Sequence, residues 1–416
     1  ASLSIVGWAL SERAAGRVLL LGQGHRVIAG AERTPHHVSN DLPWHFASQG
    51  SFVQAHLPQA ARLYEHVIER IAQLGAGRAL SILELHAGSG TLSLALAARG
   101  HRVTAVEAYA PAVRLIEDAA REQNLAVRAI ESDARAALDD SPPVDVVLVN
   151  PPRRGLEPAL RRALARTATR AIGYVSCDPE TALRDLDHLT RLGFAPSEIT
   201  PFDLMPGANV VETWSWLTPA ELPLPLVLHR DDDLLTVVKA AHEPTHPQGD
   251  GVPSLLDRVR LLPGTERAAP VHRLDAETSG VCLFSLRPES TQSLATALAE
   301  GQKTYLAWCK GVPHKRGTIR KPIVEGRARR DAVTRYERID RIAGHAVLEV
   351  ALETGRRHQI RQHLAGIGHP LLGDARYGHA ATNLHCWSKL GLDRCFLHAH
   401  RIELGGERKG LVLQAP

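Results

Sequence analysis

The fold of the first half of this chain is decided by residues 82–91, which read Ile-Leu-Glu-Leu-His-Ala-Gly-Ser-Gly-Thr. An apolar run typical of a buried strand passes through small residues into a helical pattern over Leu92–Arg99. Gly88 and Gly90 allow the backbone to approach a ligand closely, as in nucleotide-binding turns. Glu107 closes the next apolar run, where a carboxylate can accept both hydroxyls of a ribose. A purely structural turn can carry the same glycines, so the prediction of a cofactor site depends on the motifs that follow.

Apolar runs alternate with helical stretches on both sides of this turn, which indicates parallel β-α units in a Rossmann-like, doubly wound α/β sheet. The expected strands are Ser81–Leu85, Arg102–Glu107, Val127–Glu131, Val144–Val149 and Ala171–Ser176.

Three prolines within residues 218–225 cannot continue a helix and separate two differently patterned halves. We therefore predict a first domain over residues 1–218 with its core from about residue 60, a linker over 219–225 and a second domain over 226–416. Strand-like runs in the second domain lie between irregular pieces and favour an α+β fold with a mainly antiparallel sheet. These runs are Leu234–Lys239, Gly280–Ser285, Thr304–Lys310 and His345–Glu353.

Composition excludes several classes of protein. Lys plus Arg exceed Asp plus Glu by only four, 49 against 45, so local basic clusters matter more than net charge for a nucleic-acid partner. The five cysteines are scattered and never form Cys-x-x-Cys, so neither disulfides nor a zinc or iron–sulfur site is expected. No run approaches the roughly 18 apolar residues of a membrane span, and no signal segment is evident, so we expect a cytoplasmic protein. The histidine pairs lack the acidic partner of a His-Glu-x-x-His helix, so no metal is expected.

Further motifs in the first half resemble the TrmA-type RNA uracil-5-methyltransferase family, over roughly residues 42–217. They are Phe52-Val53-Gln54, the glycine turn, Asn-Pro-Pro-Arg-Arg-Gly at 150–155, Ser-Cys-Asp-Pro at 176–179, and Phe-Asp-Leu-Met-Pro at 202–206 with Glu212. The resemblance implies a class I methyltransferase fold and S-adenosylmethionine as cofactor. The residues it places around the cofactor and the base are Gln54, Glu84, Gly88, Gly90, Glu107, Asp133 and Asn150.

Two of these residues have alternative roles. Asp133 either lies near the adenine or caps a helix. The amide of Asn150 can pair with uracil, but in its flipped orientation it can equally pair with cytosine.

The resemblance also assigns chemistry to two side chains. Uracil C5 is too weak a nucleophile to attack a sulfonium methyl group, so a thiolate must first add at C6, and Cys177 takes this role. Glu212 would then remove the C5 proton. Cytosine-5 enzymes place their nucleophile after a proline at the end of the fourth strand, where this chain has Pro152-Arg153 and no thiol. Uracil is therefore the expected base.

Residues 271–280, Val-His-Arg-Leu-Asp-Ala-Glu-Thr-Ser-Gly, resemble the signature of RluA-type pseudouridine synthases. The resemblance covers about residues 226–405 and includes Lys-Thr-Tyr at 303–305 and the Arg-Arg-His-Gln-Ile-Arg run at 356–361. It implies that Asp275 is the carboxylate at the sugar, either attacking C1′ or taking a sugar proton. Arg361 would pair with Asp275 and keep it ionised, and Tyr305 would stack on the base and accept the C5 proton.

We therefore expect a bifunctional enzyme that forms 5-methyluridine and pseudouridine in RNA, with ribosomal RNA as first choice and transfer RNA as second. Both reactions need a uridine taken out of its stack, which favours single-stranded loops. One alternative is a pseudouridine synthase whose first half only binds RNA or S-adenosylmethionine. Another is an enzyme of free nucleosides or DNA. The sequence does not specify an oligomeric state.

Overall fold

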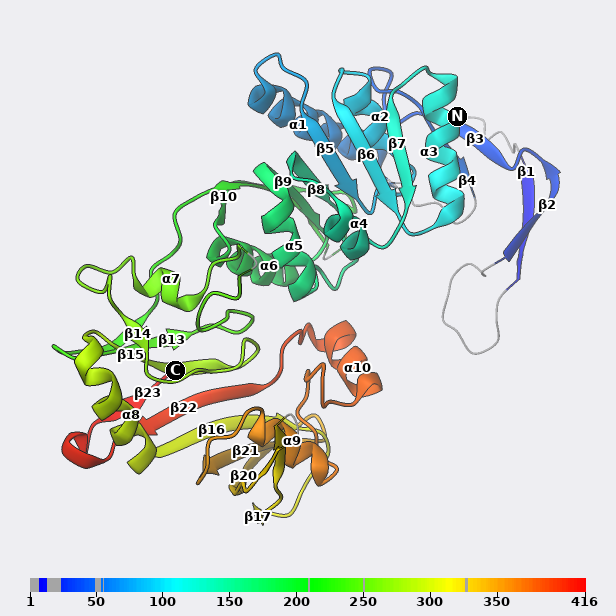
Figure 1. Ribbon diagram of the computed structural model, residues 1–416. Helices are drawn as coiled ribbons and strands as arrows, with labels where there is room; N and C mark the ends of the chain where they lie inside the picture. Colours follow the sequence, from blue (N-terminus) through cyan, green and yellow to red (C-terminus); the bar gives the residue numbers. More distant parts are fainter. Residues whose placement is uncertain are drawn as a thin grey trace. The chain divides into compact units, whose positions relative to one another are not determined.

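The computed structural model describes residues 7–12, 24–48, 54, 56–208, 210–249, 251–325 and 328–416. Phe52 and Val53 of the first methyltransferase-like motif lie outside these residues. The chain divides into two compact units, Ala1–Ala220 and Glu221–Pro416, and each is described by itself (Figure 1).

In its described part, the first unit contains a seven-stranded sheet whose order is β10-β11-β9-β8-β5-β6-β7. Strands β5, β6, β7, β8 and β9 run parallel, and β11 is antiparallel to both of its neighbours. The bounds are β5 Ser81–Leu85, β6 Arg102–Glu107, β7 Val127–Glu131, β8 Val144–Val149, β9 Ala168–Ser176, β10 Phe194–Phe202 and β11 Glu212–Pro219. The expected doubly wound sheet is thus present, and β9 begins three residues earlier than the apolar run indicated.

The helices of this unit form two groups in contact, α1 with α2 and α3, and α4 with α5 and α6. Strand order reverses between β5 and β8, and parallel crossovers are right-handed, so the two groups cover opposite faces of the sheet. The bounds are α1 Leu57–Gly75, α2 Thr91–Ala97, α3 Ala110–Glu122, α4 Ala134–Asp140, α5 Pro158–Thr167 and α6 Pro179–Arg191. Two hairpins precede them, β1 Gly7–Glu12 with β2 Gly24–Gly30, and β3 Arg33–His36 with β4 His45–Ser48.

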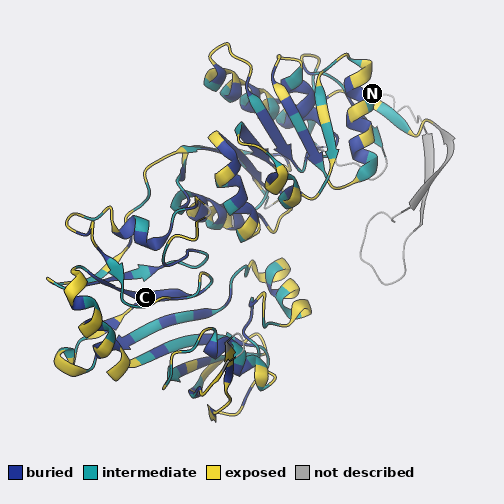
Figure 2. Ribbon diagram, in the orientation of Figure 1, coloured by how far each residue is buried: buried dark blue, intermediate teal, exposed yellow. Residues whose placement is uncertain are grey.

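The core of the first unit is the sheet itself. Strands β5 and β8 are buried along most of their length (Figure 2). Their near-continuous apolar sequences follow from this position, since helices cover both faces of a central parallel strand. The carboxyl ends of β5, β6, β8 and β9 consequently meet at one edge, which is where open α/β sheets bind ligands.

The second unit has a mainly antiparallel sheet, as the sequence predicted. Its described strands follow the order β12-β13-β15-β22-β16-β21-β20-β17, with β14 beside β15, β23 beside β22, and only β15 and β22 parallel. The bounds are β12 Val227–Arg230, β13 Leu234–Lys239, β14 Ala269–Pro270, β15 Ser279–Ser285, β16 Gln302–Cys309, β17 Arg316–Ile319, β20 Thr334–Ile342, β21 His345–Leu352, β22 Leu397–Glu403 and β23 Val412–Gln414.

Short elements complete this unit. Strands β18 Ile323–Glu325 and β19 Ala328–Arg330 form a separate hairpin. The helices are α7 Leu255–Val259, α8 Thr291–Glu300, α9 Gln359–Gly366 and α10 Ala380–Leu390. Helix α9 packs on one face of β16 and β21 through Ile360 and Leu364, which belong to the same buried cluster as Ala307 and Leu348. This packing carries the residues at the start of α9 toward the loop before β15.

A buried carboxylate in the first unit fixes the loop that follows β8. Asp185 on α6 accepts hydrogen bonds from the Leu156 N–H at 2.7 Å and from the Tyr174 hydroxyl at 2.9 Å. Its other oxygen lies 3.3 Å from Arg161, whose side chain is 1% exposed. Burial raises the pKa of Asp185, although Arg161 and Arg184 oppose the shift. The carboxylate thus links α5, α6 and the end of the loop into one structure.

Asp185→Asn should therefore lower the free energy of unfolding of the first unit by about 3–5 kcal/mol, because the buried Arg161 loses its counter-charge. Urea unfolding followed by fluorescence would measure the change. Asp187→Asn is the matched control, since Asp187 lies on the same helix with its side chain 63% exposed; it should change stability by no more than about 0.5 kcal/mol. Equal midpoints for the two variants would contradict this account of the cluster.

Candidate active sites

The glycine turn after β5 is held by the carboxylate that ends β6. Gly88 and Gly90 have φ of 57° and 77°, the left-handed region that glycine adopts without strain. A Cβ at Gly90 would lie 2.6 Å from Ile116, so a larger residue does not fit there. Glu107 accepts the N–H of Gly88 and the N–H of Tyr109, both at 3.0 Å. Each carboxylate oxygen has a second lone pair, so Glu107 retains the capacity to accept ribose hydroxyls.

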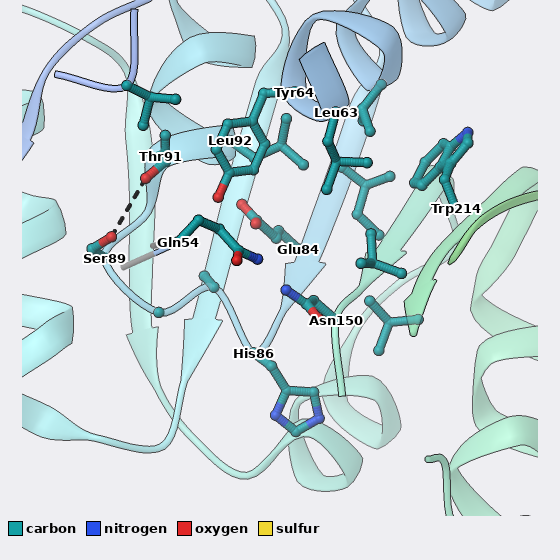
Figure 3. A pocket seen from close by; sticks show the side chains of 18 of the residues that line it. Gln54, Leu63, Tyr64, Glu84, His86, Ser89, Thr91, Leu92, Asn150 and Trp214 are labelled. Carbon is teal, nitrogen blue, oxygen red and sulfur yellow. Dashed lines mark hydrogen bonds between the residues drawn. The ribbon is translucent and has the colours of Figure 1, made fainter. Parts of the chain in front are cut away.

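A pocket opens beside this turn. Gln54, Glu84 and Asn150 come from different segments and point into the same space (Figure 3). Gly88 also lines the pocket, together with apolar side chains such as Leu63 and Trp214. The structure thus brings four of the seven proposed cofactor and base contacts into one pocket; Gly90 lies in the adjoining turn, and Glu107 ends β6 beside that turn.

Asp133, for which two roles were expected, makes helix-capping contacts. It precedes α4 as the N-cap, and its carboxylate accepts the N–H groups of Arg135 at 2.9 Å and Ala136 at 3.4 Å. Asp133 is not among the residues that line the pocket. Helix capping is observed, and the role near the adenine stays a prediction.

Burial changes the ionisation of the polar groups in the pocket. Burial raises the pKa of Glu84 to about 7, although a hydrogen bond from the Ser93 hydroxyl opposes the shift. Burial, with the neighbouring His36 and His37, lowers the pKa of His45 to about 4, so its imidazole is neutral near pH 7. His45 Nδ1 lies 3.2 Å from the Thr91 hydroxyl. Near pH 7 His45 is therefore uncharged, whereas Glu84 is divided between its neutral and its ionised form.

Cys177 and Glu212 are brought together by strand pairing. Ser176 pairs with Thr213 where β9 and β11 run antiparallel, so the residues that follow and precede them meet at the same sheet edge. Burial and then the charge of Glu212 raise the pKa of the Cys177 thiol, and Arg153 partly offsets both effects. Burial also raises the pKa of Glu212, again opposed by Arg153. A carboxyl group with a raised pKa is a stronger base once ionised.

Arg153 was not among the expected site residues, although it lies within the quoted Asn-Pro-Pro-Arg motif. The Thr181 hydroxyl donates to the Arg153 carbonyl at 3.1 Å, which ties the loop after β8 to the start of α6. Cys177 directly precedes the N-cap of that helix, Asp178. The same helix start therefore positions the thiol and the cation that favours its ionised form.

The second unit brings Asp275 and Arg361 together. Arg361 Nη1 lies 3.4 Å from Asp275, and Arg361 itself is 4% exposed. Its shortest contacts go elsewhere, with Nε and Nη2 donating to the two oxygens of Asp374 at 2.8 Å each and Nη2 donating to Glu277 at 2.8 Å. Burial lowers the pKa of Arg361, but Asp374 and Glu277 outweigh this effect and raise it above the usual range. Arg361 is thus a fixed cation beside the Asp275 carboxylate.

Buried side chains hold the loop that carries Asp275 through hydrogen bonds to its backbone. The Lys239 ammonium donates to the carbonyls of Ala276 at 3.0 Å and Glu243 at 2.6 Å, and burial lowers its pKa to about 8. The Thr245 hydroxyl donates to the Leu274 carbonyl at 3.0 Å. These contacts hold the backbone on both sides of Asp275 and so fix the position of its Cα atom.

Aromatic and imidazole groups border this carboxylate. Burial and the charge of Asp275 raise the pKa of Tyr305 on β16 above its usual range, so the phenol is protonated near pH 7. His358 Nε2 lies 3.5 Å from Asp275, and its Nδ1 lies 3.1 Å from the Tyr377 hydroxyl. The Arg361 guanidinium lies 5.5 Å from the centre of the Tyr377 ring. Tyr377, His358, Glu277 and Asp374 were not predicted as site residues, although Glu277 and His358 lie in the motifs quoted above.

Two further kinds of site are absent from the described residues. No group of three or more His, Cys, Asp or Glu side chains is placed to hold a metal ion in that part of the chain. None of its helices is long and apolar enough to cross a membrane.

Comparison with known proteins identifies two domains. Residues 45–172 match the family model of the methyltransferase small domain, and residues 233–366 match that of RNA pseudouridylate synthase. The chain is 36% identical to ribosomal large subunit pseudouridine synthase D of Xanthomonas campestris pv. campestris, over 47% of this chain and 65% of that protein. It is 28% identical to tRNA pseudouridine synthase C of Haemophilus ducreyi, over 42% of this chain and 82% of that protein.

Among solved structures, the chain is similar to the Pyrococcus abyssi tRNA (uracil-54, C5)-methyltransferase in complex with S-adenosyl-L-homocysteine. The TM-score is 0.45 at 26% identity, and the match covers 52% of each chain. The chain spans between half and two thirds of the length of several curated relatives that it matches.

Proposed function

We propose that this chain, which contains a methyltransferase small domain followed by an RNA pseudouridylate synthase domain, modifies uridines in RNA with two separate active sites. The second would form pseudouridine at Asp275, and the first would form 5-methyluridine at Cys177. The observation that carries the proposal is the Asp275 carboxylate beside the buried Arg361, inside the domain that matches the synthase model.

Pseudouridine formation breaks the N1–C1′ bond, turns the uracil and joins C5 to C1′. Asp275 would act at the sugar, either by attacking C1′ or by removing a sugar proton. Arg361, a buried cation fixed by Asp374 and Glu277, would attract the Asp275 carboxylate and help to orient it. Only a phenolate could accept the C5 proton, and the raised pKa of Tyr305 keeps it a phenol, so we propose that Tyr305 serves mainly to stack on the base.

The first site fits S-adenosylmethionine. A Cβ built on Gly88 would meet no atom within 4 Å, so this turn leaves room for a ligand, and Glu107 beside it offers free lone pairs. When bound, the cofactor supplies an electrophilic methyl group. Cys177 would add to C6 of the uracil and make C5 nucleophilic, and Glu212 would afterwards take the C5 proton so that the thiolate can leave.

Ribosomal RNA is the proposed target, and transfer RNA is the second candidate. The relative named for ribosomal RNA is 36% identical to this chain, whereas the one named for transfer RNA is 28% identical. Both reactions act on a base that has left its stack, so the target uridines should lie in single-stranded loops.

Tritium release from RNA that contains 5-tritiated uridine tests both activities, because each reaction removes the hydrogen at C5. Pseudouridine formation should release tritium without a methyl donor, and adding S-adenosylmethionine should increase the release. The Asp275→Ala variant should lose the release that needs no methyl donor. The Cys177→Ala variant should lose the additional release that S-adenosylmethionine causes. Turnover on free uridine or on DNA would instead favour an enzyme of nucleosides or DNA.

S-adenosylmethionine binding should weaken by about 10-fold to 100-fold in Glu107→Ala, because a hydrogen bond to a charged group contributes about 1.5–3 kcal/mol. Isothermal titration calorimetry would measure the affinity. Glu117→Ala provides the control, since Glu117 is an exposed residue on the neighbouring helix α3. Failure of the wild-type protein to bind the cofactor would reject the methyltransferase proposal and leave an RNA-binding first half as the better description.

A further inference from the structure

A basic groove lies at one end of the second unit's sheet, beyond the residues proposed for catalysis. Its volume is about 510 Å³, and its lining residues come from the turn before β17, the end of β20 and the segment after α9. The residues that line it are Val312, Pro313, His314, Lys315, Arg338, Arg341 and His369. Three of these side chains are cations, two are imidazoles and none is a carboxylate.

A β-bulge aims two arginines into the groove. The pairing of β20 with β21 shifts between Arg338 and Asp340, so one extra residue changes which side chains share a face. Arg338 consequently pairs with Leu348 and Arg341 with Ala346, two residues buried on the same face of β21. Regular alternation would have placed Asp340 beside Arg338. The bulge replaces that aspartate with a second arginine.

Hydrogen bonds also hold the backbone around the groove. Arg338 Nη1 donates to the Pro313 carbonyl at 2.8 Å, and the Arg338 N–H donates to the Lys315 carbonyl at 2.7 Å. His369 Nδ1 lies 2.9 Å from the Lys310 carbonyl. The nearby Glu337 carboxylate forms an ion pair with Arg316, whose Nη2 lies 2.8 Å from its Oε1. Lys315 and Arg341 are exposed, so their charges face solvent from a fixed backbone.

The groove and the proposed synthase site lie along one face of the sheet. Ala307 and Cys309 of β16 belong to the buried cluster that contains Ala346 and Leu348, and Tyr305 packs against the same cluster. Cys309 pairs with Ala346, which places the end of β16 beside the groove. Tyr305 lies four residues back along the strand, or about 13 Å. This spacing allows one strand of RNA to reach from the proposed site to the groove.

We infer that the basic groove binds phosphate groups of the RNA strand that carries the target uridine, a short distance from that nucleotide. This inference rests on the proposed pseudouridine synthase activity. Clustered cations without a carboxylate attract the phosphate backbone, whatever the base sequence. The only apolar lining residues are Val312 and Pro313, and no aromatic residue is present to anchor a protein partner. The groove therefore acts as a second contact that orients the strand.

The test compares Lys315→Ala/Arg341→Ala with Arg267→Ala/Lys409→Ala. Both variants of the full chain remove two exposed cations from the second unit, and only the first pair lies in the groove. Affinity for a fluorescent single-stranded RNA containing the target uridine is measured by anisotropy at several salt concentrations. Pseudouridine formation is measured on the same RNA and on a shorter one trimmed to a few nucleotides around the uridine.

The groove variant should bind the long RNA about tenfold more weakly, and its plot of log affinity against log salt should be shallower by about 1.4, since each single-strand phosphate contact contributes about 0.7. Its KM for the long RNA should rise while kcat is unchanged. On the short RNA, the groove variant and the wild type should have the same KM and kcat. The control pair should match the wild type, and thermal melting should be the same for all three proteins.

Equal salt slopes and KM values for the groove and control variants, with an active wild type, would overturn the groove proposal alone and favour an acidic protein as its partner. A wild type that binds RNA but forms no pseudouridine would overturn the proposed function. In that case the salt slopes still decide whether the groove binds phosphates.

Discussion

Asp275→Asn is expected to abolish pseudouridine formation, with a loss of about 10⁴-fold or more in kcat. The amide has the size of the carboxylate but cannot attack C1′ or accept a sugar proton. The loss should appear in kcat more than in KM, because the substituted atom acts on the reacting bond and not on the RNA backbone. Quantifying pseudouridine in a defined RNA after reaction with each variant measures the effect.

Asp232→Asn is the control for this change, since Asp232 is an exposed aspartate in the same unit. The variant should retain full activity. The Asp275→Asn protein should still form 5-methyluridine at the wild-type rate, because Cys177 lies in the other compact unit. Retention of pseudouridine formation by Asp275→Asn would show that another group attacks the sugar, and the proposed mechanism would fail.

Cys177→Ala is expected to abolish 5-methyluridine formation, also by about 10⁴-fold or more, because no other group would make C5 of uracil nucleophilic. Pseudouridine formation by the same protein should be unchanged. Transfer of a labelled methyl group from S-adenosylmethionine to RNA measures the loss. Cys386→Ala should methylate normally, since Cys386 lies on α10 of the second unit. Methylation by Cys177→Ala would place the nucleophile elsewhere.

The pH dependence of Cys177 provides a second measurement of the same site. Burial and the Glu212 charge raise the thiol pKa, so the thiolate fraction is small at neutral pH and increases as pH rises toward that pKa. Alkylation of Cys177 by iodoacetamide should therefore accelerate with pH. Glu212→Gln removes a negative charge and should move this profile to lower pH, whereas Arg153→Gln removes a positive charge and should move it to higher pH. A profile that neither substitution changes would show that the three side chains are not electrostatically coupled.

Local sequence was a good guide to the elements of the first unit. The strands at Ser81–Leu85, Arg102–Glu107 and Val144–Val149 have the bounds expected from their apolar runs. Such runs are reliable because a central parallel strand must be apolar on both faces. The bounds were less accurate for β9, which starts at Ala168, where Thr169 and Arg170 interrupt the apolar pattern. Edge and surface positions tolerate polar residues, so the pattern weakens there.

For the candidate sites, sequence motifs indicated individual residues but only some of the contacts between them. The motifs identified Asp275 and Arg361, and the structure places their side chains 3.4 Å apart. The motifs did not show that Asp374 and Glu277 hold the guanidinium more closely than Asp275 does. Nor did they show the influence of Arg153 on Cys177 and Glu212. These relations join residues far apart in the sequence, and no local pattern encodes them.

The sequence by itself determined the two fold classes, because the alternation of apolar runs with helices or turns dictates which sheet can bury them. It also determined which residue types are available for chemistry. Only the tertiary structure decided their charge states and neighbours, from the raised pKa of Cys177 to the groove that the β20 bulge lines with two arginines. The physical reason is that desolvation and Coulomb interactions depend on distances through space, which chain folding sets and sequence separation does not.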